Sequence, residues 1–458
     1  MSVTSLGRLF VSGRAPETLM ATRDDVALRF GRFAADVAHA AATVSAAGVK
    51  RGAVLSTDPY RFLIGLFGLM HAGATVVLPP DGMASTLTDL RNRFDVLLTD
   101  ELSPADFAVL PIPEGEGDEG QDGAAAIGAL DPEKAMLEFF TSGSTGSAKL
   151  IAKPLVMLDR EIATLDALWG ATMGGGPVLA TVPHRHIFGL TFHLLWPLAS
   201  GRPFVSHVDG LWEPLLARGL AGAVLVTSPA HLMRLGGIER AGWGRGPARV
   251  FTAGAPLLAV HAAEAADVLG VPPTEIFGST ETGAIATRTA GEAWTPLPRI
   301  AVSANDDGRM IVRSPYGPDG ESFLSADRIE MTGDGGFHFL GRADRIAKIE
   351  GRRVNLVRLE EELTALPSVL DAAALVLGDT PGRLAAAIVL NDEGRGRLDM
   401  IGAFRLGREL RQQLSRRLEA TWLPKSWRFV DELPRGAMGK RSEADTRALF
   451  TARKVSGS

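Results

Sequence analysis

Helical runs alternate with short apolar runs along most of this chain, and that alternation limits the fold more than any other feature. An alanine-rich helical run at 33–48 precedes strand-like runs at 54–56, 76–78 and 95–100. The pattern resumes with strand-like runs at 178–182, 223–228, 248–254 and 274–279. Strands separated by helices are typical of α/β domains. We therefore expect an α/β fold whose large N-terminal domain contains stacked, mostly parallel sheets and helices.

The last third of the chain has a different pattern of strand-like and helical runs, which predicts a second domain. Short strand-like runs at 309–314 and 335–342 lead into a charged stretch, GRADRIAKIEGRRV, and strands then mix with basic helical runs. We place the boundary at Asp344. This gives a large domain over residues 1–343 and a small α+β C-terminal domain over residues 344–458.

Composition excludes several classes of function. The net charge of −5 argues against a protein that binds nucleic acid or an anionic membrane. The chain has no cysteine, which excludes disulfides and thiolate sites and makes a cytoplasmic location the expectation. The most apolar stretch, Phe62–Met70, is too short to span a bilayer. It predicts a buried helix that leads into a strand at 75–78.

The segment TSGSTGSAK, residues 141–149, predicts a phosphate-binding loop. Glycines let the backbone approach a ligand closely, and exposed N–H groups, hydroxyls and one ammonium suit phosphate oxygens. The spacing differs from that of the common G-x-x-x-x-G-K-[ST] motif, because Lys149 is followed by Leu150 rather than by a hydroxyl residue. Taken alone, such a stretch has a flexible turn as its alternative interpretation.

Chemically useful residues follow two strand-like runs, at the carboxyl ends where open α/β sheets bind ligands. Gly254 and Ala255 end one run, where a flat ring would fit against the backbone. In the run IFGSTETG, Phe277 would stack on a base, Thr280 would bond a phosphate and Glu281 would hold Mg²⁺, which prefers oxygen ligands. A tight turn before a helix is the alternative interpretation of the segment with Gly254 and Ala255.

Taken in order, these segments resemble the motifs of the acyl-adenylate-forming superfamily of acyl-CoA synthetases, aryl-acid ligases, peptide-synthetase adenylation domains and luciferases. The resemblance covers roughly residues 30–445. It rests on TSGSTGSAK, PHRHIFGL, GAPL, FGSTETG, TGD, GRADRIAKIEGRRV and LPRGAMGK, which follow the family's order. The implied reaction has two steps and uses ATP and Mg²⁺. A carboxylate attacks the α-phosphate to give an acyl-adenylate and pyrophosphate, and a thiol then displaces AMP.

The resemblance also implies the roles of individual residues. The implied nucleotide-binding residues are Thr141, Ser142, Gly143, Ser144, Thr145, Gly146, Lys149, Gly254, Ala255, Phe277, Gly278, Thr280, Asp334, Arg342 and Arg353. Among them, Asp334 and Arg342 would bind ribose, although an aspartate in a turn is usually only a turn former. Glu281 is the implied metal ligand. The implied catalytic residues are Lys440, Thr280 and the gating residue His186.

The C-terminal domain is expected to be mobile and to rotate between the two steps about Asp344. Lys440 would serve adenylation, and the face with Lys348 and Gly351 would serve the thiol step. Four residues depart from the family pattern. Phe277 stands where a tyrosine is commoner, and Arg345 replaces a usual aspartate. Glu350 replaces a small residue, and Arg358 replaces a usual glutamate. The last three belong to the expected thiol face and put free CoA in doubt as the acceptor.

The substrate region HIFGLTFHLLW has no acid to grip an α-amino group, which argues against amino acids as substrates. Its apolar run would line an acyl or aryl pocket, or would be a helix face packed in the core: Phe188, Leu190, Phe192 and Trp196. The compact length and the segments at 76–100 and 152–165 resemble the short ligases of aryl-polyene pigment clusters. This likeness favours an aryl acid as substrate and an acyl carrier protein as partner.

Four hypotheses follow. The first is an ATP-dependent ligase that loads an aryl or acyl group onto a carrier protein. The second is an acyl-CoA synthetase that uses free CoA and a short or medium acyl acid. The third is a protein that only senses ATP or an acyl-adenylate, which the presence of both Lys440 and Glu281 disfavours. The fourth is an ADP-forming kinase or synthetase.

Overall fold

The computed structural model describes residues 3–100, 107–115, 127–142, 148–236, 238, 246–289, 291, 293–317, 321–342, 345–349, 352–378, 383–435 and 443–451. The chain divides into two compact units. Unit 1 comprises Met1–Ala301 and Val312–Phe323, and unit 2 comprises Val302–Ile311 and Leu324–Ser458. The predicted boundary residue, Asp344, lies outside the described residues, so the boundary at that position stays a prediction.

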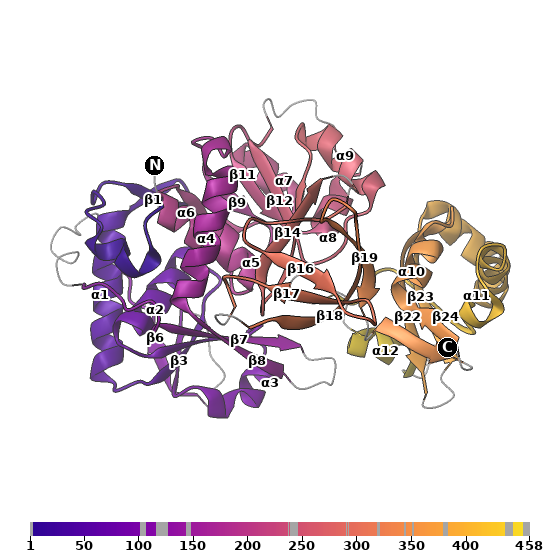
Figure 1. Ribbon diagram of the computed structural model, residues 1–458, viewed down its shortest axis with the longest axis horizontal. Coiled ribbons are helices and arrows are strands. Elements are labelled where there is room, and N and C mark those ends of the chain that lie inside the picture. Colours follow the sequence, from indigo (N-terminus) through magenta and orange to yellow (C-terminus); the bar gives the residue numbers. More distant parts are fainter. Residues whose placement is uncertain are drawn as a thin grey trace. The chain divides into compact units, whose positions relative to one another are not determined.

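A nine-stranded sheet forms one half of unit 1 (Figure 1). Its strands, in order across the sheet, are β15 (Thr295–Pro296), β14 (Gly283–Thr289), β13 (Thr274–Ser279), β12 (Arg249–Ala253), β11 (Val224–Thr227), β9 (Val178–Ala180), β10 (Phe204–Val208), β1 (Leu19–Arg23) and β2 (Val26–Arg29). Neighbours from β13 to β1 are parallel. The remaining pairs, at both edges, are antiparallel. The parallel centre agrees with the expected strand–helix alternation.

A six-stranded sheet forms the other half of unit 1. Its strands, in order, are β6 (Val109–Pro111), β5 (Val96–Thr99), β3 (Arg51–Leu55), β4 (Thr75–Leu78), β7 (Met136–Ser142) and β8 (Ala148–Pro154). All neighbours are parallel except β7 and β8, which form an antiparallel hairpin. The segment predicted to bind phosphate therefore begins in β7 and ends in β8.

Helices pack between and around the two sheets. The longer ones are α1 (Phe30–Ala46), α2 (Pro59–His71), α4 (Leu155–Trp169) and α9 (Ala259–Leu269). The shorter ones are α3 (Ala84–Asp89), α5 (Ile187–Gly189), α6 (Trp196–Ser200), α7 (Trp212–Arg218) and α8 (Pro229–Leu232). Helix α2 contacts β3 and β4 of one sheet and β10 of the other, and α4 contacts β8 and β14. The sheets are thus stacked with helices between them, as expected.

Helix α2 shows why its sequence folds this way. Asp58 caps its first turn by accepting a hydrogen bond from the backbone N–H of Arg61, and Pro59 occupies the first helical position. Every residue from Phe62 to Met70 is buried, and Gly73, at φ +72°, turns the chain into β4. The prediction of a buried helix leading into a strand at 75–78 is confirmed.

In its described residues, unit 2 is built from small sheets and three α-helices. A four-stranded sheet contains β16 (Ala301–Ala304), β17 (Arg309–Arg313), β18 (Phe323–Met331) and β19 (Phe337–Arg342), and β20 (Ile346–Ile349) pairs with β21 (Arg352–Asn355). A three-stranded sheet contains β22 (Val369–Leu377), β23 (Arg383–Leu390) and β24 (Ser426–Val430). The helices are α10 (Leu356–Thr364), α11 (Asp392–Leu414) and α12 (Glu443–Thr451). The expected α+β character is confirmed.

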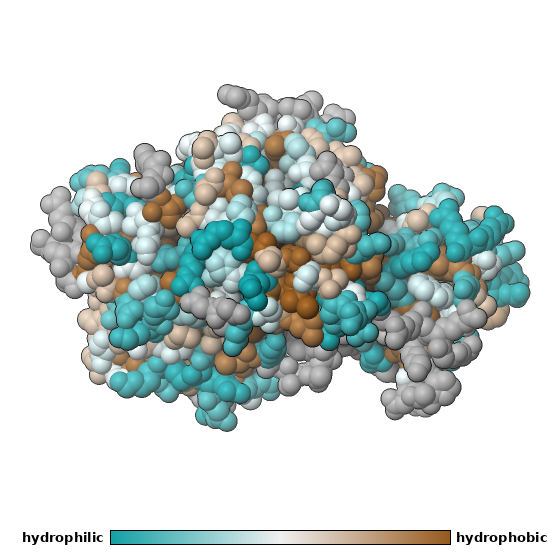
Figure 2. Space-filling model, viewed as in Figure 1, coloured by the Kyte–Doolittle hydropathy of each residue, from teal (hydrophilic) through white to brown (hydrophobic). Residues whose placement is uncertain are grey.

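Burial gives each part its own apolar core. One core in unit 2 joins Leu359 and Leu363 of α10 to Ile388 of β23 and Leu410 of α11. In Figure 2, hydrophilic residues cover much of the visible surface, with apolar residues scattered among them. Among the described residues, we find no helix with the combined length and apolar character that a membrane crossing requires.

Candidate active site

Four parallel strands of the nine-stranded sheet end at the same edge, and polar side chains follow several of them. Strands β9, β11, β12 and β13 run in one direction. Beyond β9, the hydroxyl of Thr181 lies 2.7 Å from that of Thr227, the last residue of β11. Beyond β12, Gly254 adopts φ +98° and is exposed. The residues predicted at strand ends are therefore brought to one edge, where open α/β sheets bind ligands.

The β7–β8 hairpin places the predicted phosphate loop. Thr141 pairs with Lys149 across the hairpin, and Ser142 pairs with Ala148. For Thr141 and Ser142 the structure describes the backbone only, and the four other predicted loop residues lie outside the described residues: Gly143, Ser144, Thr145 and Gly146. The side chain of Lys149 is described and is 57% exposed.

Lys149 forms an ion pair with Glu281, the predicted metal ligand. Its Nζ lies 3.1 Å from Oε1 of Glu281, whose side chain is 23% exposed, and 5.8 Å from the centre of the Phe323 ring. Burial alone would raise the pKa of Glu281. The hydrogen bond and charge of Lys149, together with hydrogen bonds from the backbone and from Ser279, outweigh this effect, and the pKa falls below its usual value. Two residues from different sheets, both assigned to the ATP site, thus contact one another.

The turn that carries Glu281 is fixed by its own hydroxyl groups. Ser279 and Thr282 exchange hydrogen bonds, since each backbone N–H donates to the other's side-chain oxygen at 3.2 Å. Gly283 follows at φ +68°, a region that favours glycine. Thr280, predicted to touch the α-phosphate, is half-buried in this turn.

Beneath this turn lies a buried pair of charged residues that the sequence interpretation missed. Lys153 of β8 and Glu161 of α4 are each only 2% exposed. Burial lowers the pKa of Lys153 and raises that of Glu161, and the attraction between the two charges opposes both shifts. The available signal was the position of Glu161 on the apolar face of helix α4, three residues after Leu158 and next to Ile162.

The aromatic residue predicted to stack on the base is half-buried in β13. The ring of Phe277 packs edge-on against Trp294 with centroids 5.0 Å apart. Gly278 follows, where a Cβ would meet the carbonyl oxygen of Gly283 at 2.2 Å, so only glycine fits there. Ala255, the other predicted ring contact, is half-buried after β12.

The predicted gate precedes a distorted helix. His186 is half-buried and directly precedes α5, and a π-helical stretch, η5 (Leu190–Leu195), continues it. Such stretches are frequent at functional sites. Phe192 and Trp196 are 2% and 0% exposed, and Phe192 packs edge-on against Phe251 of β12 at 5.3 Å. For these two residues the structure favours the core interpretation over a pocket lining.

Unit 2 contains the remaining predicted residues. Asp334 lies in an exposed turn, where a hydrogen bond from Thr332 lowers its pKa. Arg342 ends β19 with its guanidinium 3.8 Å from Asp327. The backbones of Lys348 and Arg353 pair across β20 and β21. Four residues of unit 2 named in the sequence analysis lie outside the described residues: Asp344, Glu350, Gly351 and Lys440.

The expected thiol face is only partly available for contact. Arg345 is 21% exposed and binds Oε1 of Glu360, which also accepts a 2.8 Å hydrogen bond from the backbone N–H of Ala374. This arginine is therefore engaged within its own unit. Arg358 remains exposed, with its guanidinium 5.6 Å from the Trp422 ring centre.

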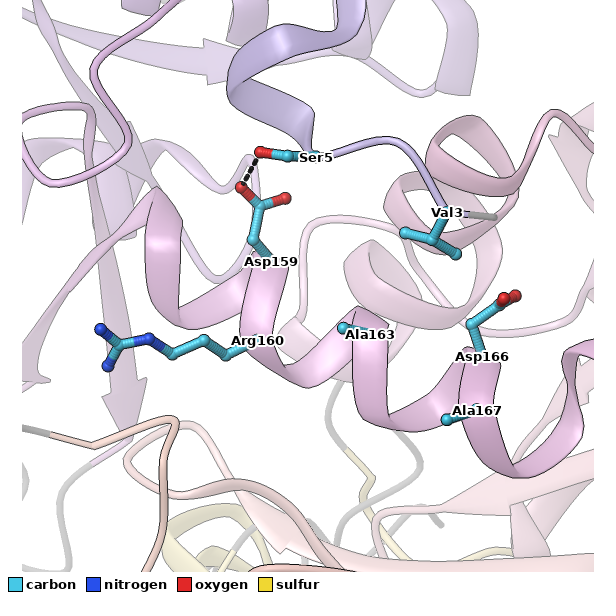
Figure 3. A pocket seen from close by; sticks show the side chains of 7 residues that line it. All are labelled: Val3, Ser5, Asp159, Arg160, Ala163, Asp166 and Ala167. Atoms are coloured by element: carbon cyan, nitrogen blue, oxygen red, sulfur yellow. Dashed lines mark hydrogen bonds between the residues drawn. The ribbon is translucent and has the colours of Figure 1, made fainter. Parts of the chain in front are cut away.

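A surface hollow elsewhere in unit 1 does not contribute to this site. It is lined by Val3, Ser5, Asp159, Arg160, Ala163, Asp166 and Ala167 (Figure 3). Its carboxylates already have partners, because Ser5 donates to Asp159 at 2.6 Å and the Trp196 indole donates to Asp166 at 2.9 Å. The hollow lies on the N-terminal segment and helix α4, not at the strand ends.

The protein groups at the strand ends could bind Mg²⁺ only if phosphate oxygens of a ligand completed the coordination. Within the described part of the chain, no cluster of three or more His, Asp or Glu side chains gathers in a way suited to a metal ion. Mg²⁺ is commonly bound by one or two carboxylates together with waters and substrate phosphates. Glu281 beside the phosphate-loop lysine matches that arrangement.

Comparisons with known proteins agree with this geometry. Residues 11–316 match the family described as AMP-binding enzyme, and residues 358–440 match the AMP-binding enzyme C-terminal domain. The chain is 32% identical to a 4-coumarate–CoA ligase of Rhodobacter capsulatus, over 69% of this chain and 77% of that protein. It is 26% identical to an indoleacetate–CoA ligase of Aromatoleum aromaticum, over 71% and 69%. The fold superposes with a TM-score of 0.80 on o-succinylbenzoate CoA synthetase (MenE) of Bacillus subtilis in complex with the acyl-adenylate intermediate OSB-AMP, at 18% identity over 99% of both chains.

Proposed function

The chain belongs to the AMP-binding enzyme family, and from that premise we propose that it activates an aryl acid with ATP and transfers the acyl group to the phosphopantetheine thiol of an acyl carrier protein. The coarser function, an adenylate-forming ligase, follows from the family itself. The observation that carries the proposal is the contact of Lys149 with Glu281 at the strand ends. It joins a phosphate-binding cation to a carboxylate suited to Mg²⁺.

The first step brings two anions together, which explains the charges at the site. A carboxylate oxygen of the acid bonds to the α-phosphorus, and the bond from that phosphorus to the bridging oxygen breaks to release pyrophosphate. Lys149 would neutralise phosphate charge, Thr280 would donate to the α-phosphate, and Glu281 would hold Mg²⁺. When bound, Mg²⁺ supplies further positive charge to the phosphates.

The second step replaces the mixed acyl–phosphate anhydride by a thioester. The sulfur of the acceptor thiol bonds to the acyl carbon, AMP leaves with the pair of electrons from the broken C–O bond, and the thiol proton is released. Lys348 and Gly351 are the residues proposed for this step, after rotation of the C-terminal domain about Asp344. Lys440 is proposed for the first step.

The names of two relatives support an aryl acid as substrate. One is named for 4-coumarate and the other for indoleacetate, and both are aromatic carboxylates. The proposal of a carrier-protein acceptor is supported by the altered residues of the expected thiol face, of which Arg358 is exposed.

The second candidate is a CoA ligase, and the same names favour it, because both relatives are CoA ligases. Intact-mass analysis separates the two acceptors. We would offer the activated acid either a phosphopantetheinylated carrier protein or free CoA. A mass increase on the carrier alone supports the carrier proposal, whereas acyl-CoA as the only product establishes the alternative.

The test of the proposal as a whole is ATP–pyrophosphate exchange with a panel of acids. The panel contains 3- and 4-hydroxybenzoate, cinnamates, and short and medium fatty acids. Exchange that depends on an aryl acid supports the proposal. Exchange only with fatty acids contradicts the aryl assignment, and ADP rather than AMP as the nucleotide product contradicts the reaction type.

A further inference from the structure

We propose that Lys153 and Glu161 are positioning residues for Glu281, and that this buried pair sets the enzyme's affinity for ATP in its magnesium complex while leaving AMP binding nearly unchanged. The inference rests on the proposed function, since it takes Glu281 as the residue that faces Mg²⁺. It adds a supporting layer beneath the turn, which the residues predicted from the sequence do not include.

Lys153 holds the turn from below. Its Nζ donates hydrogen bonds to the carbonyl oxygen of Glu281 at 3.0 Å and to that of Tyr316 at 3.3 Å. The side chain is almost completely buried. Burying an ammonium group costs several kcal/mol per ion, about as much as its partners can return. A hydrophobic residue in this strand would avoid that cost, so the charge calls for a specific explanation.

Glu161 holds the far side of the same turn. Its Oε1 accepts a 2.9 Å hydrogen bond from the backbone N–H of Ala284. Its Oε2 is buried with no hydrogen-bond partner. A Cβ at Gly283 would lie 2.8 Å from that oxygen, so the backbone of the turn rests directly on the carboxylate.

The two contacts fix the backbone at Glu281 itself and at the third residue after it. The carbonyl of Glu281 is bound by Lys153, and the N–H three residues later is bound by Glu161. The carboxylate of Glu281 instead points to Lys149, which is more than half exposed. A rigid carboxylate of fixed direction is what metal-ligand geometry requires.

The competing explanation is that the pair only stabilises the packing of β8 against α4. That explanation predicts that a substitution weakens the binding of all three ligands equally or leaves the binding of all three unchanged. The positioning role predicts a selective loss, because AMP has no β- and γ-phosphates for a metal to bridge. Affinity measured with and without Mg²⁺ therefore separates the two.

The experiment uses the full-length protein and isothermal titration calorimetry with three ligands: ATP with excess Mg²⁺, ATP with EDTA, and AMP. The variants are Lys153→Met and Glu161→Gln, and the latter keeps an oxygen for the N–H of Ala284. For both we expect the Kd of ATP with Mg²⁺ to rise about tenfold or more, which is the size reported for loss of a group that orients a metal ligand. The Kd for AMP and for ATP with EDTA should change less than about twofold.

A double-mutant cycle tests whether the pair acts through Glu281. Glu281→Gln alone should weaken the binding of ATP in the presence of Mg²⁺. Adding Lys153→Met to this variant should cause little further loss of affinity. The proposal would be overturned if the losses of affinity from the two substitutions were additive. It would also be overturned if the affinities for all three ligands fell equally. If Lys153→Met does not fold, Glu161→Gln and its combination with Glu281→Gln decide the question in the same way.

The matched control is Arg288→Met. Arg288 pairs with buried Glu275 at 2.9 Å across the same β13–β14 hairpin, away from the turn. We expect this variant to lower the thermal midpoint without changing the ratio of the Kd values for ATP with Mg²⁺ and for AMP. Failure of the wild-type protein to bind ATP would count against the proposed function itself. Binding that is unchanged in both variants would count only against the positioning role.

Discussion

Nζ of Lys149 lies 3.1 Å from Oε1 of Glu281, although 132 residues separate them in the sequence. The lysine belongs to the six-stranded sheet and the glutamate to the turn between β13 and β14 of the nine-stranded sheet. In this ion pair the two opposite charges neutralise each other. A triphosphate with Mg²⁺ would offer the lysine an anion and the glutamate a cation, so the pair would be exchanged for two stronger partners.

Lys149→Met should weaken the binding of ATP far more than the binding of AMP. Charge-assisted hydrogen bonds to phosphate are strong, so we expect a loss of about 10- to 100-fold in ATP affinity and a smaller loss for AMP. Calorimetry with each nucleotide measures this. Lys134→Met is the control, because Lys134 is 84% exposed and forms an ion pair with nearby Asp131. Equal weakening of both nucleotides would contradict the phosphate role.

Lys440→Ala should nearly abolish adenylation, by about 10³-fold, if this lysine stabilises the charge that develops in the first step. ATP binding and folding should stay largely intact. The measurements are ATP–pyrophosphate exchange, nucleotide binding and the thermal midpoint. Supplying the preformed acyl-adenylate should restore thioester formation. A variant that exchanges at the wild-type rate would show that the assigned role is wrong.

Gly283→Ala should destabilise unit 1 by about 1–3 kcal/mol, the cost of holding a residue with a side chain in a sparsely populated backbone region. The position has φ +68°, and its Cβ would also meet Oε2 of Glu161. Chemical denaturation measures the free energy of unfolding. Gly13→Ala is the control, because Gly13 has φ +76° but open space around its Cβ. The Gly283 variant should be the less stable of the two, and the reverse order would contradict the contact with Glu161.

His193 should make the fold sensitive to acid. Burial lowers its pKa to about 4, so the folded chain binds fewer protons there than the unfolded chain does. Its stabilising contribution is complete above the unfolded pKa of about 6.5 and is lost as the pH falls toward 4. The resulting loss in the free energy of unfolding approaches about 3 kcal/mol.

A glutamine at this position removes the titration and keeps a donor for the carbonyl of Val205, 3.0 Å from Nε2. His193→Gln should therefore lose less unfolding free energy between pH 7 and pH 4.5 than the wild type in denaturant titrations. His39→Gln, at an exposed position, should follow the wild-type curve. Parallel curves for all three proteins would refute the assignment to His193.

Arg345→Ala should destabilise unit 2 by about 3 kcal/mol, because it removes the guanidinium of Arg345 from the buried carboxylate of Glu360. Glu360 is 9% exposed, and its Oε1 is shared with the N–H of Ala374. Arg417→Ala should change stability by less than about 1 kcal/mol, since Arg417 is 58% exposed and 3.7 Å from Glu362. Thermal unfolding of the two variants gives the comparison. Similar midpoints would mean that the Arg345 pair contributes little.

Much of the fold could be predicted because it depends on local patterns. Apolar runs of strand length separated by helices predict a parallel sheet, and the small or polar residues after each run mark its ligand-binding edge. The buried helix α2 was recognisable from its continuous apolar sequence and the glycine after it. These features require no knowledge of what packs against them.

The supporting layer of the site could not be predicted in the same way. Lys153 and Glu161 stand eight residues apart, and nothing local indicates that the Glu281 turn closes over them. That contact depends on how the two sheets stack. The same limit applies to Phe192 and Trp196, whose spacing fits a pocket or a core equally well until the position of Phe251 is known.

The division of the site between two sheets has a thermodynamic consequence. The proposed phosphate contacts come from the β7–β8 hairpin of one sheet, and the Glu281 turn belongs to the other, so a bound nucleotide would act as a cross-link between them. Ligand binding and sheet stacking are then linked equilibria, and each strengthens the other. A substitution deep in the layer of helices between the sheets, far from any phosphate, would appear as an affinity defect. Conversely, saturation with nucleotide would raise the thermal midpoint of unit 1.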